Sequence, residues 1–268
     1  MTTTEIETSH GIMAVDDSGT DGFPVVFVHG NSASRTIFRH QVDAEWATDY
    51  RMIALDLLGH GDSQDARDPE VAYTQRGYAD SIVEVLTQLG IDRAVVVGWS
   101  LGGHIGLEMI AKFPGLTGLV VTGTPPANAE TLNEAFRSGD GLAVGGTEII
   151  TEQEAELFAR LAAVPFEQGA LDAAIRTDGR ARKVMFDAFA AGRESDQKQL
   201  VATSSVPLAV IDGAQDPFVN TEYVASLTYA NLWEGIYHVI PGAGHASFWE
   251  APEIYNPVLR RFLVEHAR

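Results

Sequence analysis

Short runs of apolar residues alternate with helical patterns along this chain, and this alternation restricts its fold more than any other feature. The runs cover residues 25–28, 52–55, 94–97, 119–121, 208–211 and 237–240. Because these runs are apolar at nearly every position, they fit parallel strands that are covered on both faces. The segments between them would supply crossover helices. The sequence therefore predicts an α/β fold with a mostly parallel, doubly wound sheet.

The segment from about residue 126 to residue 202 interrupts this alternation. It contains helical patterns and no strand-like run, and Thr151 and Glu154 form a capping-box pattern at the start of one helix. Ordinary crossover helices could fill such a segment, but its length favours an insertion. We therefore expect a core domain of residues 1–125 and 203–268 and a helical cap of residues 126–202 over the edge of the sheet.

The charge balance limits the partners of the chain. Its 268 residues include 18 Lys and Arg against 37 Asp and Glu, so the net charge is −19. Negative charge repels nucleic acids and anionic membranes, so we expect neither as a partner, and it favours a neutral small-molecule substrate. The amino-terminal residues lack the cationic start and apolar stretch of a signal peptide, which predicts a cytoplasmic protein. The sequence assigns no oligomeric state.

The segment Gly98-Trp99-Ser100-Leu101-Gly102 matches the pattern Gly-x-Ser-x-Gly. It follows the predicted strand at 94–97 and precedes a helical pattern, which is the setting that the pattern requires. A tight turn there exposes the serine hydroxyl, and the flanking glycines let the strand and the helix approach each other. The alternative is a glycine-rich turn with an inert serine. We predict that Ser100 is a catalytic nucleophile.

His29-Gly30-Asn31 follows the predicted strand at 25–28 and should lie at the same edge of the sheet. A serine nucleophile creates a tetrahedral intermediate whose negative oxygen needs two fixed hydrogen-bond donors. The backbone N–H groups of Asn31 and Leu101 are the predicted donors of this oxyanion hole. The Asn31 amide could also hold a water molecule or the substrate carbonyl, unless Asn31 is only a loop residue with an unusual dihedral angle.

The nucleophile needs a base, and the base needs a carboxylate that fixes its tautomer. We predict His245 as the base, because it ends a glycine-rich loop directly after the last apolar run. We predict Asp216 as the carboxylate, since it follows the run at 208–211 and gives the chain order Ser, Asp, His. Asp212 is a rival, but its position at the strand end favours a buried, hydrogen-bonded aspartate.

The sequence gives little support for metal or cofactor chemistry. It has no His-x-His pair, no His-x-x-x-His helix, no acidic calcium loop and no cysteine. Without cysteine the chain can form neither a disulfide nor a thiolate nucleophile. The glycines near Ser100 do not have the Gly-x-Gly-x-x-Gly spacing of a dinucleotide site. We expect neither a metal nor a cofactor.

With these residues assembled, the chain resembles the α/β-hydrolase superfamily over essentially its whole length. More narrowly, it is similar to the metal-independent N-acyl-homoserine lactone lactonases, which are quorum-quenching enzymes. The segments that carry this narrower resemblance are 28–32, 98–106, 122–126, 176–182 and 231–235. The resemblance implies an α/β-hydrolase fold with a helical cap inserted after the sixth strand. Those lactonases differ from this chain in having a glutamate in place of Asp216 and a tyrosine in place of Phe158.

The resemblance also implies a reaction and a substrate pocket. Ser100 would attack the carbonyl of the lactone ring, His245 would accept its proton, and water would release N-acyl-homoserine from the acyl-enzyme. The residues that would bind the substrate are Trp99, beside the nucleophile, and four that would form an acyl tunnel beneath the cap: Phe38, Phe158, Met185 and Phe218. Ordinary core packing is the alternative for each of these four.

Other functions of the same fold stay open. A general carboxylesterase or a carbon–carbon bond hydrolase would use the same triad, so only substrates distinguish them from a lactonase. Ser100 excludes the usual chemistry of haloalkane dehalogenases and most epoxide hydrolases, which need an aspartate nucleophile. A ligand receptor that keeps the triad and turns over slowly is a further class. Slow turnover combined with tight ligand binding would favour the receptor.

Overall fold

A computed structural model of the chain describes the backbone of all 268 residues and every side chain except that of Asp140. The strands are β1 (Thr2–Thr8), β2 (Gly11–Asp17), β3 (Phe23–Val28), β4 (Tyr50–Leu55), β5 (Ala94–Trp99), β6 (Leu116–Thr122), β7 (Leu208–Gly213) and β8 (His238–Ile240). They form one sheet in the order β1-β2-β4-β3-β5-β6-β7-β8. Neighbours are parallel from β4 to β8, and β1 and β2 pair antiparallel. This sheet confirms the predicted fold class.

The hairpin of β1 and β2 was not among the strands predicted from the sequence. β1 lies at the edge of the sheet, and only Ile6 and Thr8 of its residues are buried. An edge strand with a solvent-exposed face carries polar residues, here including Thr2, Thr3 and Thr4. A pattern of continuous apolar residues detects strands that are covered on both faces and therefore overlooks β1. β2 contains an apolar run at residues 12–15 that fits this pattern and was not predicted. With the hairpin counted, the helical insertion follows the sixth strand, as the resemblance implied.

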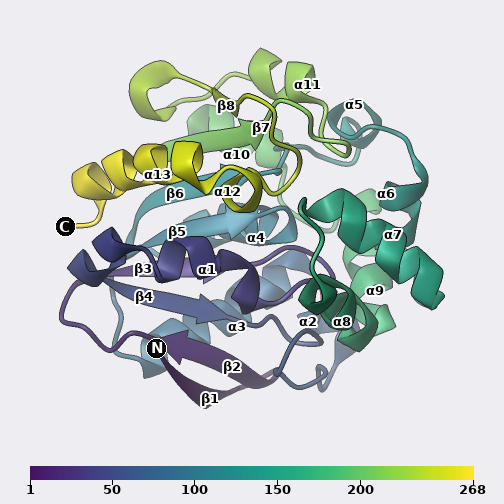
Figure 1. Cartoon of the computed structure of the whole chain (residues 1–268), viewed down its shortest axis with the longest axis horizontal. Coiled ribbons are helices and arrows are strands. Elements are labelled where there is room, and N and C mark those ends of the chain that lie inside the picture. The colour runs from purple at the N-terminus through teal and green to yellow at the C-terminus, as the bar shows by residue number, and fades with distance from the viewer.

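Helices cover both faces of the sheet (Figure 1). α3 (Gln75–Gln88) and α4 (Leu101–Lys112) pack on one face, whereas α1 (Arg39–Val42), α12 (Ser247–Glu250) and α13 (Pro252–His266) pack on the other. The shorter elements are η1 (Arg35–Phe38), η2 (Glu45–Asp49), α2 (Pro69–Ala72), α11 (Thr221–Ser226) and η3 (Trp233–Gly235). The hydrophobic core thus has two layers, one on each side of the sheet. In the described part of the chain, no helix combines the length and apolarity needed to cross a membrane.

The chain between β6 and β7 is helical. Its helices are α5 (Leu132–Ala135), α6 (Asp140–Gly145), α7 (Glu152–Ala162), α8 (Gln168–Arg176), α9 (Gly179–Ala190) and α10 (Gln197–Thr203). α7 begins at the expected capping box, in which Thr151 Oγ1 accepts from the Glu154 N–H and the Glu154 carboxylate accepts from the Thr151 N–H. Figure 1 shows α6 to α9 gathered on one side of the sheet. These helices occupy the segment that we expect to form the cap.

Hydrogen bonds join the turn between α8 and α9 to the core. The Tyr73 hydroxyl donates to the Asp178 carboxylate over 2.6 Å, and the Asp178 N–H donates to the Gly59 carbonyl over 2.8 Å. The Arg176 guanidinium donates to the Ser63 carbonyl over 2.7 Å. These contacts connect the helical segment to the loop that follows β4, at the carboxyl end of the sheet.

Candidate active site

Ser100 occupies the sharp turn between β5 and α4. Its φ is 53° and its ψ is −118°, a conformation that residues with a side chain rarely adopt. A Cβ on Gly102 would overlap the carbonyl oxygen of Val28, and one on Gly98 would overlap the backbone of Gly102. The two glycines of the pattern are therefore required by the close approach of β3, β5 and α4. This turn places Ser100 at the border of a pocket.

The two predicted oxyanion donors come from segments that meet at Ser100. Leu101 is the first residue of α4, so its N–H has no acceptor within the helix. A Cβ on Gly30 would lie 3.1 Å from the Ser100 Cβ, so the loop after β3 runs directly against this turn. The Asn31 side-chain amide donates to the carbonyl of Gly145, at the end of α6, over 2.8 Å. Since this side chain already binds the end of α6, the backbone N–H of Asn31 is the candidate donor.

A buried cluster behind this loop fixes its position. The fully buried Asp56 carboxylate accepts from the Arg35 N–H over 2.7 Å and forms an ion pair with the Arg35 guanidinium. The His29 Nε2 accepts from the Leu57 N–H over 3.0 Å. Burial lowers the pKa of His29, which keeps the ring neutral in this acceptor role. The place of Asp56 after the strand at 52–55 predicts that it organises a loop at this edge of the sheet, but its pairing with Arg35 was not predicted, because the two residues belong to different loops.

His245 and Asp216 form a hydrogen-bonded pair. The His245 Nδ1–H donates to Asp216 Oδ2 over 2.7 Å. Asp216 Oδ1 accepts from the N–H groups of Phe218 and Val219, over 2.8 and 2.9 Å, which fixes the carboxylate. Because Nδ1 is occupied, Nε2 is the nitrogen that can accept a proton. His245 borders the same pocket as Ser100, an arrangement that suits a Ser-His-Asp triad.

Two further residues position His245, and the sequence pattern predicted neither in this role. The Trp99 indole N–H donates to the His245 carbonyl over 3.0 Å, and the two rings lie 5.5 Å apart. The Glu250 carboxylate accepts from the N–H groups of Gly244 and Ala246, over 2.7 and 3.2 Å. Because these groups flank His245 in the chain, Glu250 fixes the loop on both sides of the imidazole.

Asp212 lies behind this pair, fully buried at the end of β7. Its Oδ1 accepts from the Gly123 N–H over 2.6 Å, and its Oδ2 accepts from the Tyr237 hydroxyl over 2.8 Å. Gly123 has a φ of 62°, and a Cβ on it would lie 2.6 Å from the His245 Cε1. Asp212 therefore supports a turn that packs against the imidazole. It has the buried, hydrogen-bonded position expected of it, and Asp216 rather than Asp212 contacts His245.

Replacing Asp212 with asparagine should make the free energy of unfolding less dependent on pH. Burial raises the pKa of Asp212 to about 7, and the nearby Asp216 adds to this increase. Since the pKa of an unfolded aspartate is about 3.9, this group stabilises the fold most below pH 4, and the contribution is lost as the pH rises towards 7. The asparagine oxygen can still accept from Gly123, and its amide can donate to Tyr237. The variant should therefore gain stability relative to wild type as the pH rises.

Chemical denaturation of both proteins at pH 5 and pH 8 measures this change. Asp49→Asn is the matched control, because Asp49 is exposed and its replacement should shift the stability by a similar amount at both values. If the difference between Asp212→Asn and wild type were the same at pH 5 and pH 8, Asp212 would not titrate as the structure indicates.

The pocket at Ser100 is mostly apolar and lies between the carboxyl end of the sheet and helices α6, α7 and α9. Three of the predicted substrate-binding residues border it: Phe158 on α7, Met185 on α9 and Phe218 after β7. Phe136, Phe186 and Phe189 border it as well, although the sequence pattern does not mark them as pocket residues. The helical pattern of residues 126–202 includes these residues, but such a pattern does not distinguish a residue that faces the core from one that faces a pocket.

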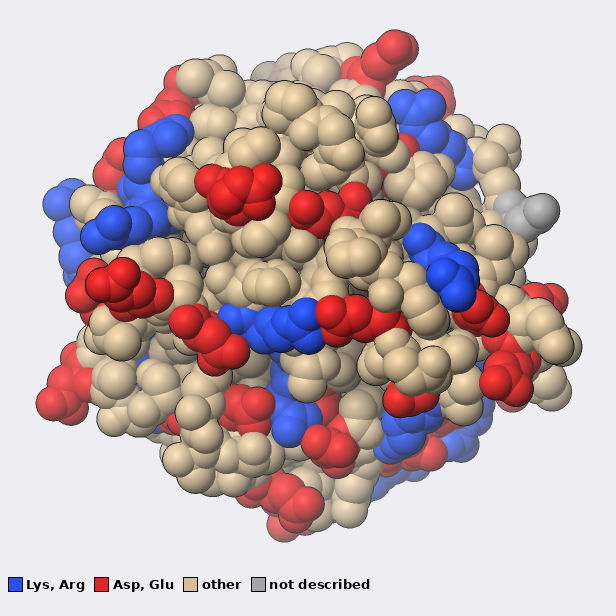
Figure 2. Space-filling view, in the orientation of Figure 1, with Lys and Arg blue, Asp and Glu red and all other residues tan. Residues whose placement is uncertain are grey.

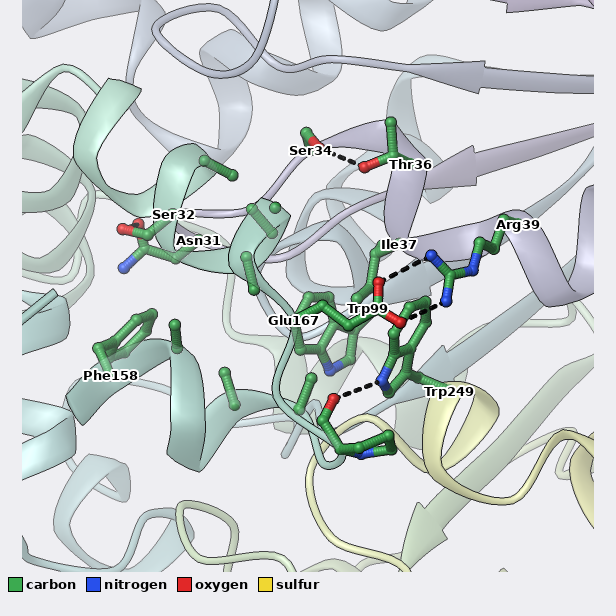
Figure 3. Close-up of a pocket in the computed structure, with 18 residues that line it drawn as sticks. Asn31, Ser32, Ser34, Thr36, Ile37, Arg39, Trp99, Phe158, Glu167 and Trp249 are labelled. Carbon is green, nitrogen blue, oxygen red and sulfur yellow. Dashed lines mark hydrogen bonds and ion pairs between the residues drawn. The ribbon is translucent and has the colours of Figure 1, made fainter. Parts of the chain in front are cut away.

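A second pocket adjoins the first and shares Asn31 and Phe158 with it (Figure 3). Trp99 borders this second pocket. At its rim, the Arg39 guanidinium donates two hydrogen bonds to the Glu167 carboxylate, over 2.8 and 2.6 Å, and lies 4.3 Å from the centre of the Trp249 ring. The two pockets therefore meet at Asn31 and Phe158, beside the candidate oxyanion hole.

Phe38 is the predicted pocket residue that the structure does not bring to the site. Its ring centroid lies 5.2 Å from that of Phe27 and 4.9 Å from that of Phe248, and its side chain is almost completely buried. η1 turns this side chain toward the face of the sheet that α12 and α13 cover. Ordinary core packing, the alternative that we considered for Phe38, describes its surroundings.

Acidic side chains are dispersed over the face of the molecule that is drawn in Figure 2. Figure 2 shows Asp and Glu scattered over one face of the molecule, interspersed with Lys and Arg. Among the side chains that the structure describes, no group of three or more His, Asp or Glu is placed to hold a metal ion.

Comparisons with known proteins relate this arrangement to a family. The chain resembles crystal structures of the N-acyl homoserine lactonase AidH. The complex of AidH with N-butanoyl homoserine is 47% identical in sequence, covers 100% of this chain and 98% of its own, and has a TM-score of 0.98. A serine-to-glycine mutant of AidH complexed with N-hexanoyl homoserine lactone is also 47% identical, with a TM-score of 0.96 and coverage of 98% and 97%.

More distant relatives include enzymes with other names. A 2-hydroxy-6-oxononadienedioate/2-hydroxy-6-oxononatrienedioate hydrolase of Pseudomonas sp is 25% identical over 95% of this chain and 92% of its own length. The family described as "Alpha/beta hydrolase family" matches residues 25–258, a range that runs from β3 to α13 and includes Ser100, Asp216 and His245. The chain therefore belongs to the alpha/beta hydrolase family.

Proposed function

We propose that this chain hydrolyses N-acyl-homoserine lactones by opening the lactone ring. One observation carries the proposal: Ser100 and His245 border a single apolar pocket, and the His245 Nδ1–H donates to Asp216. The relationship to AidH, at 47% identity over the whole chain, supports this choice of substrate class. In this proposal, residues 126–202 form the cap that covers the bound acyl chain.

The reaction would proceed through an acyl-enzyme. The Ser100 Oγ attacks the lactone carbonyl carbon while His245 Nε2 accepts the serine proton. The backbone N–H groups of Asn31 and Leu101 stabilise the negative oxygen of the tetrahedral intermediate. The ring C–O bond then breaks, and His245 returns the proton to the departing ring oxygen. Water attacks the acyl-enzyme with His245 again as base, which releases N-acyl-homoserine and restores Ser100.

The pocket suits a neutral substrate with an apolar tail. Phe158, Met185 and Phe218 provide apolar contacts for an acyl chain next to the reacting groups. The neutral lactone also avoids the repulsion that an acidic protein exerts on anions, whereas the product carries a carboxylate. This repulsion would favour product release. Trp99, which supports His245, would act on the substrate only through the second pocket.

The bond that breaks tests the proposal directly, because an N-acyl-homoserine lactone contains a ring ester and a side-chain amide. We expect cleavage of the ester, since resonance makes the amide carbonyl the poorer electrophile and the amide nitrogen must be protonated before it can leave. Incubation of N-hexanoyl-homoserine lactone to completion, followed by mass spectrometry, should detect N-hexanoyl-homoserine. Acidification should then close the ring and recover the starting lactone.

Two results would contradict this function. Free hexanoic acid as the main product, with no recovery on acidification, would indicate an acylase. Hydrolysis of p-nitrophenyl butanoate without hydrolysis of any acyl-homoserine lactone would instead indicate a general carboxylesterase. The matched control is the Ser100→Ala variant, which should leave the lactone intact except for spontaneous hydrolysis.

A further inference from the structure

Two buried polar side chains border the mostly apolar pocket at Ser100, in addition to Asn31, Ser100 and His245. They are Gln75, the first residue of α3, and His104, one turn along α4 from Ser100. Gln75 is fully buried and His104 is 5% exposed. The rings of Phe136 and Phe189 flank His104 at centroid distances of 6.1 and 5.4 Å. In apolar surroundings, polar groups need hydrogen-bond partners.

Gln197, on α10, determines which atom of His104 is free. Its Nε2 donates to the backbone carbonyl of His104 over 3.3 Å, and a carbonyl can only accept. The Gln197 Oε1 is therefore the atom that lies 2.7 Å from His104 Nδ1, so Nδ1 carries the proton. His104 Nε2 is left with a lone pair that can accept a hydrogen bond. Burial also lowers the pKa of His104 to about 4, so the ring is neutral at physiological pH.

The Gln197 side-chain amide also leaves Gln75 with a free hydrogen-bond donor. The Gln197 Nε2 donates to Gln75 Oε1 over 2.8 Å, which fixes the orientation of the Gln75 amide. Gln75 Nε2 is buried, and none of the described residues offers it an acceptor. An unpaired buried donor is unfavourable and calls for a partner. Beside this pocket, a free donor and a free acceptor thus lie on neighbouring side chains.

We propose that Gln75 and His104 form a subsite for a hydroxyl group on the acyl chain of the substrate, an inference that rests on the proposed lactonase function. The hydroxyl oxygen would accept from Gln75 Nε2, and the hydroxyl proton would be donated to His104 Nε2. One hydroxyl therefore satisfies both free groups. A keto oxygen would accept from Gln75 but has no proton for His104, and a methylene satisfies neither.

The position of His104 relative to Ser100 indicates which carbon carries the hydroxyl. Four residues along a helix correspond to a rise of about 6 Å. The third carbon of the acyl chain is five bonds from the lactone carbonyl carbon, which an extended chain spans in about 6 Å. The subsite therefore fits a 3-hydroxyacyl group whose lactone carbonyl lies at Ser100.

The test compares N-(3-hydroxyhexanoyl)-homoserine lactone with N-hexanoyl-homoserine lactone. Wild type should hydrolyse the hydroxylated lactone with a kcat/KM at least about tenfold higher, since a site built to bond a hydroxyl discriminates against a substrate that lacks one. Gln75→Met removes the amide donor at similar volume and should reduce this ratio to near one. Gln88→Met, an exposed substitution on the same helix, should preserve the ratio. His104→Phe is a second test, and it should also remove the preference.

Binding measurements separate failure of this inference from failure of the proposed function. Calorimetry with the Ser100→Ala variant gives the Kd of each lactone without turnover. Cleavage of both lactones by wild type at equal kcat/KM, with equal Kd values, would refute the hydroxyl subsite and leave the lactonase function intact. Preferential binding of the hydroxylated lactone without cleavage by wild type would refute the lactonase function and support the subsite. A ratio that Gln75→Met and His104→Phe both leave unchanged would also refute the subsite.

Discussion

Replacement of Ser100 by alanine is expected to lower kcat for lactone hydrolysis by about 10⁵-fold to 10⁶-fold. The Oγ of Ser100 is the atom that would form the acyl-enzyme, and the neighbouring N–H groups alone provide only the residual catalysis of the oxyanion hole. Ser100 adopts its strained backbone conformation at a pocket that His245 also borders, and among the described side chains no other hydroxyl group borders that pocket. Single-turnover kinetics with N-hexanoyl-homoserine lactone measures the effect.

Covalent labelling provides a second readout for this variant. A fluorophosphonate should label wild type at Ser100 and leave Ser100→Ala unlabelled. Ser205→Ala is the matched control, because Ser205 is exposed and lies before β7, and it should retain wild-type activity and labelling. Activity of Ser100→Ala within tenfold of wild type would exclude Ser100 as the nucleophile.

The second large effect should follow from Asp216→Asn, which we expect to lower kcat by about 10⁴-fold. Asp216 Oδ1 accepts two backbone N–H groups, so the oxygen of an asparagine would keep that position. Its amide nitrogen would then face His245 Nδ1 as a donor and force the imidazole proton onto Nε2. A histidine in that tautomer cannot accept the proton of Ser100. Steady-state kinetics at neutral pH measures this loss.

Asp216→Glu is the control for this prediction. It keeps a carboxylate that can accept from His245 Nδ1, and the lactonases that the chain resembles carry a glutamate at this position. Its loss of kcat should therefore be at least 100-fold smaller than that of Asp216→Asn. If Asp212→Asn were the more impaired of the two asparagine variants, Asp212 would be the acid of the triad.

The sequence was sufficient to predict features that depend on short segments. The Gly-x-Ser-x-Gly turn is one of them, because Gly98 and Gly102 are needed wherever a strand and a helix pack so closely. The pairing of His245 with Asp216 followed from chain order, since parallel strands bring their carboxyl ends to one edge. The polar edge strand β1 was not predicted, because it has no continuous apolar run.

Features that depend on packing between distant segments were beyond the sequence pattern. Phe38 and Phe158 are equally apolar residues near predicted helices, yet Phe38 faces the core and Phe158 faces the pocket. Which surface each one meets depends on how η1 and α7 are oriented by their neighbours. The free atoms of Gln75 and His104 depend on Gln197, which lies 93 residues beyond His104 in the chain. A hydrogen-bond network of this kind has no sequence period by which it could be recognised.

The close approach at the Ser100 turn also determines where directed evolution of this protein can succeed. At Gly98, Gly102 and Gly123, any side chain would overlap the backbone or the His245 ring, so codons randomised there would yield mostly inactive clones. Met185 and Phe186 come from a cap helix and border the pocket without forming the turn. In a combinatorial library confined to such cap positions, a much higher fraction of the variants would therefore fold and could be screened for new substrates.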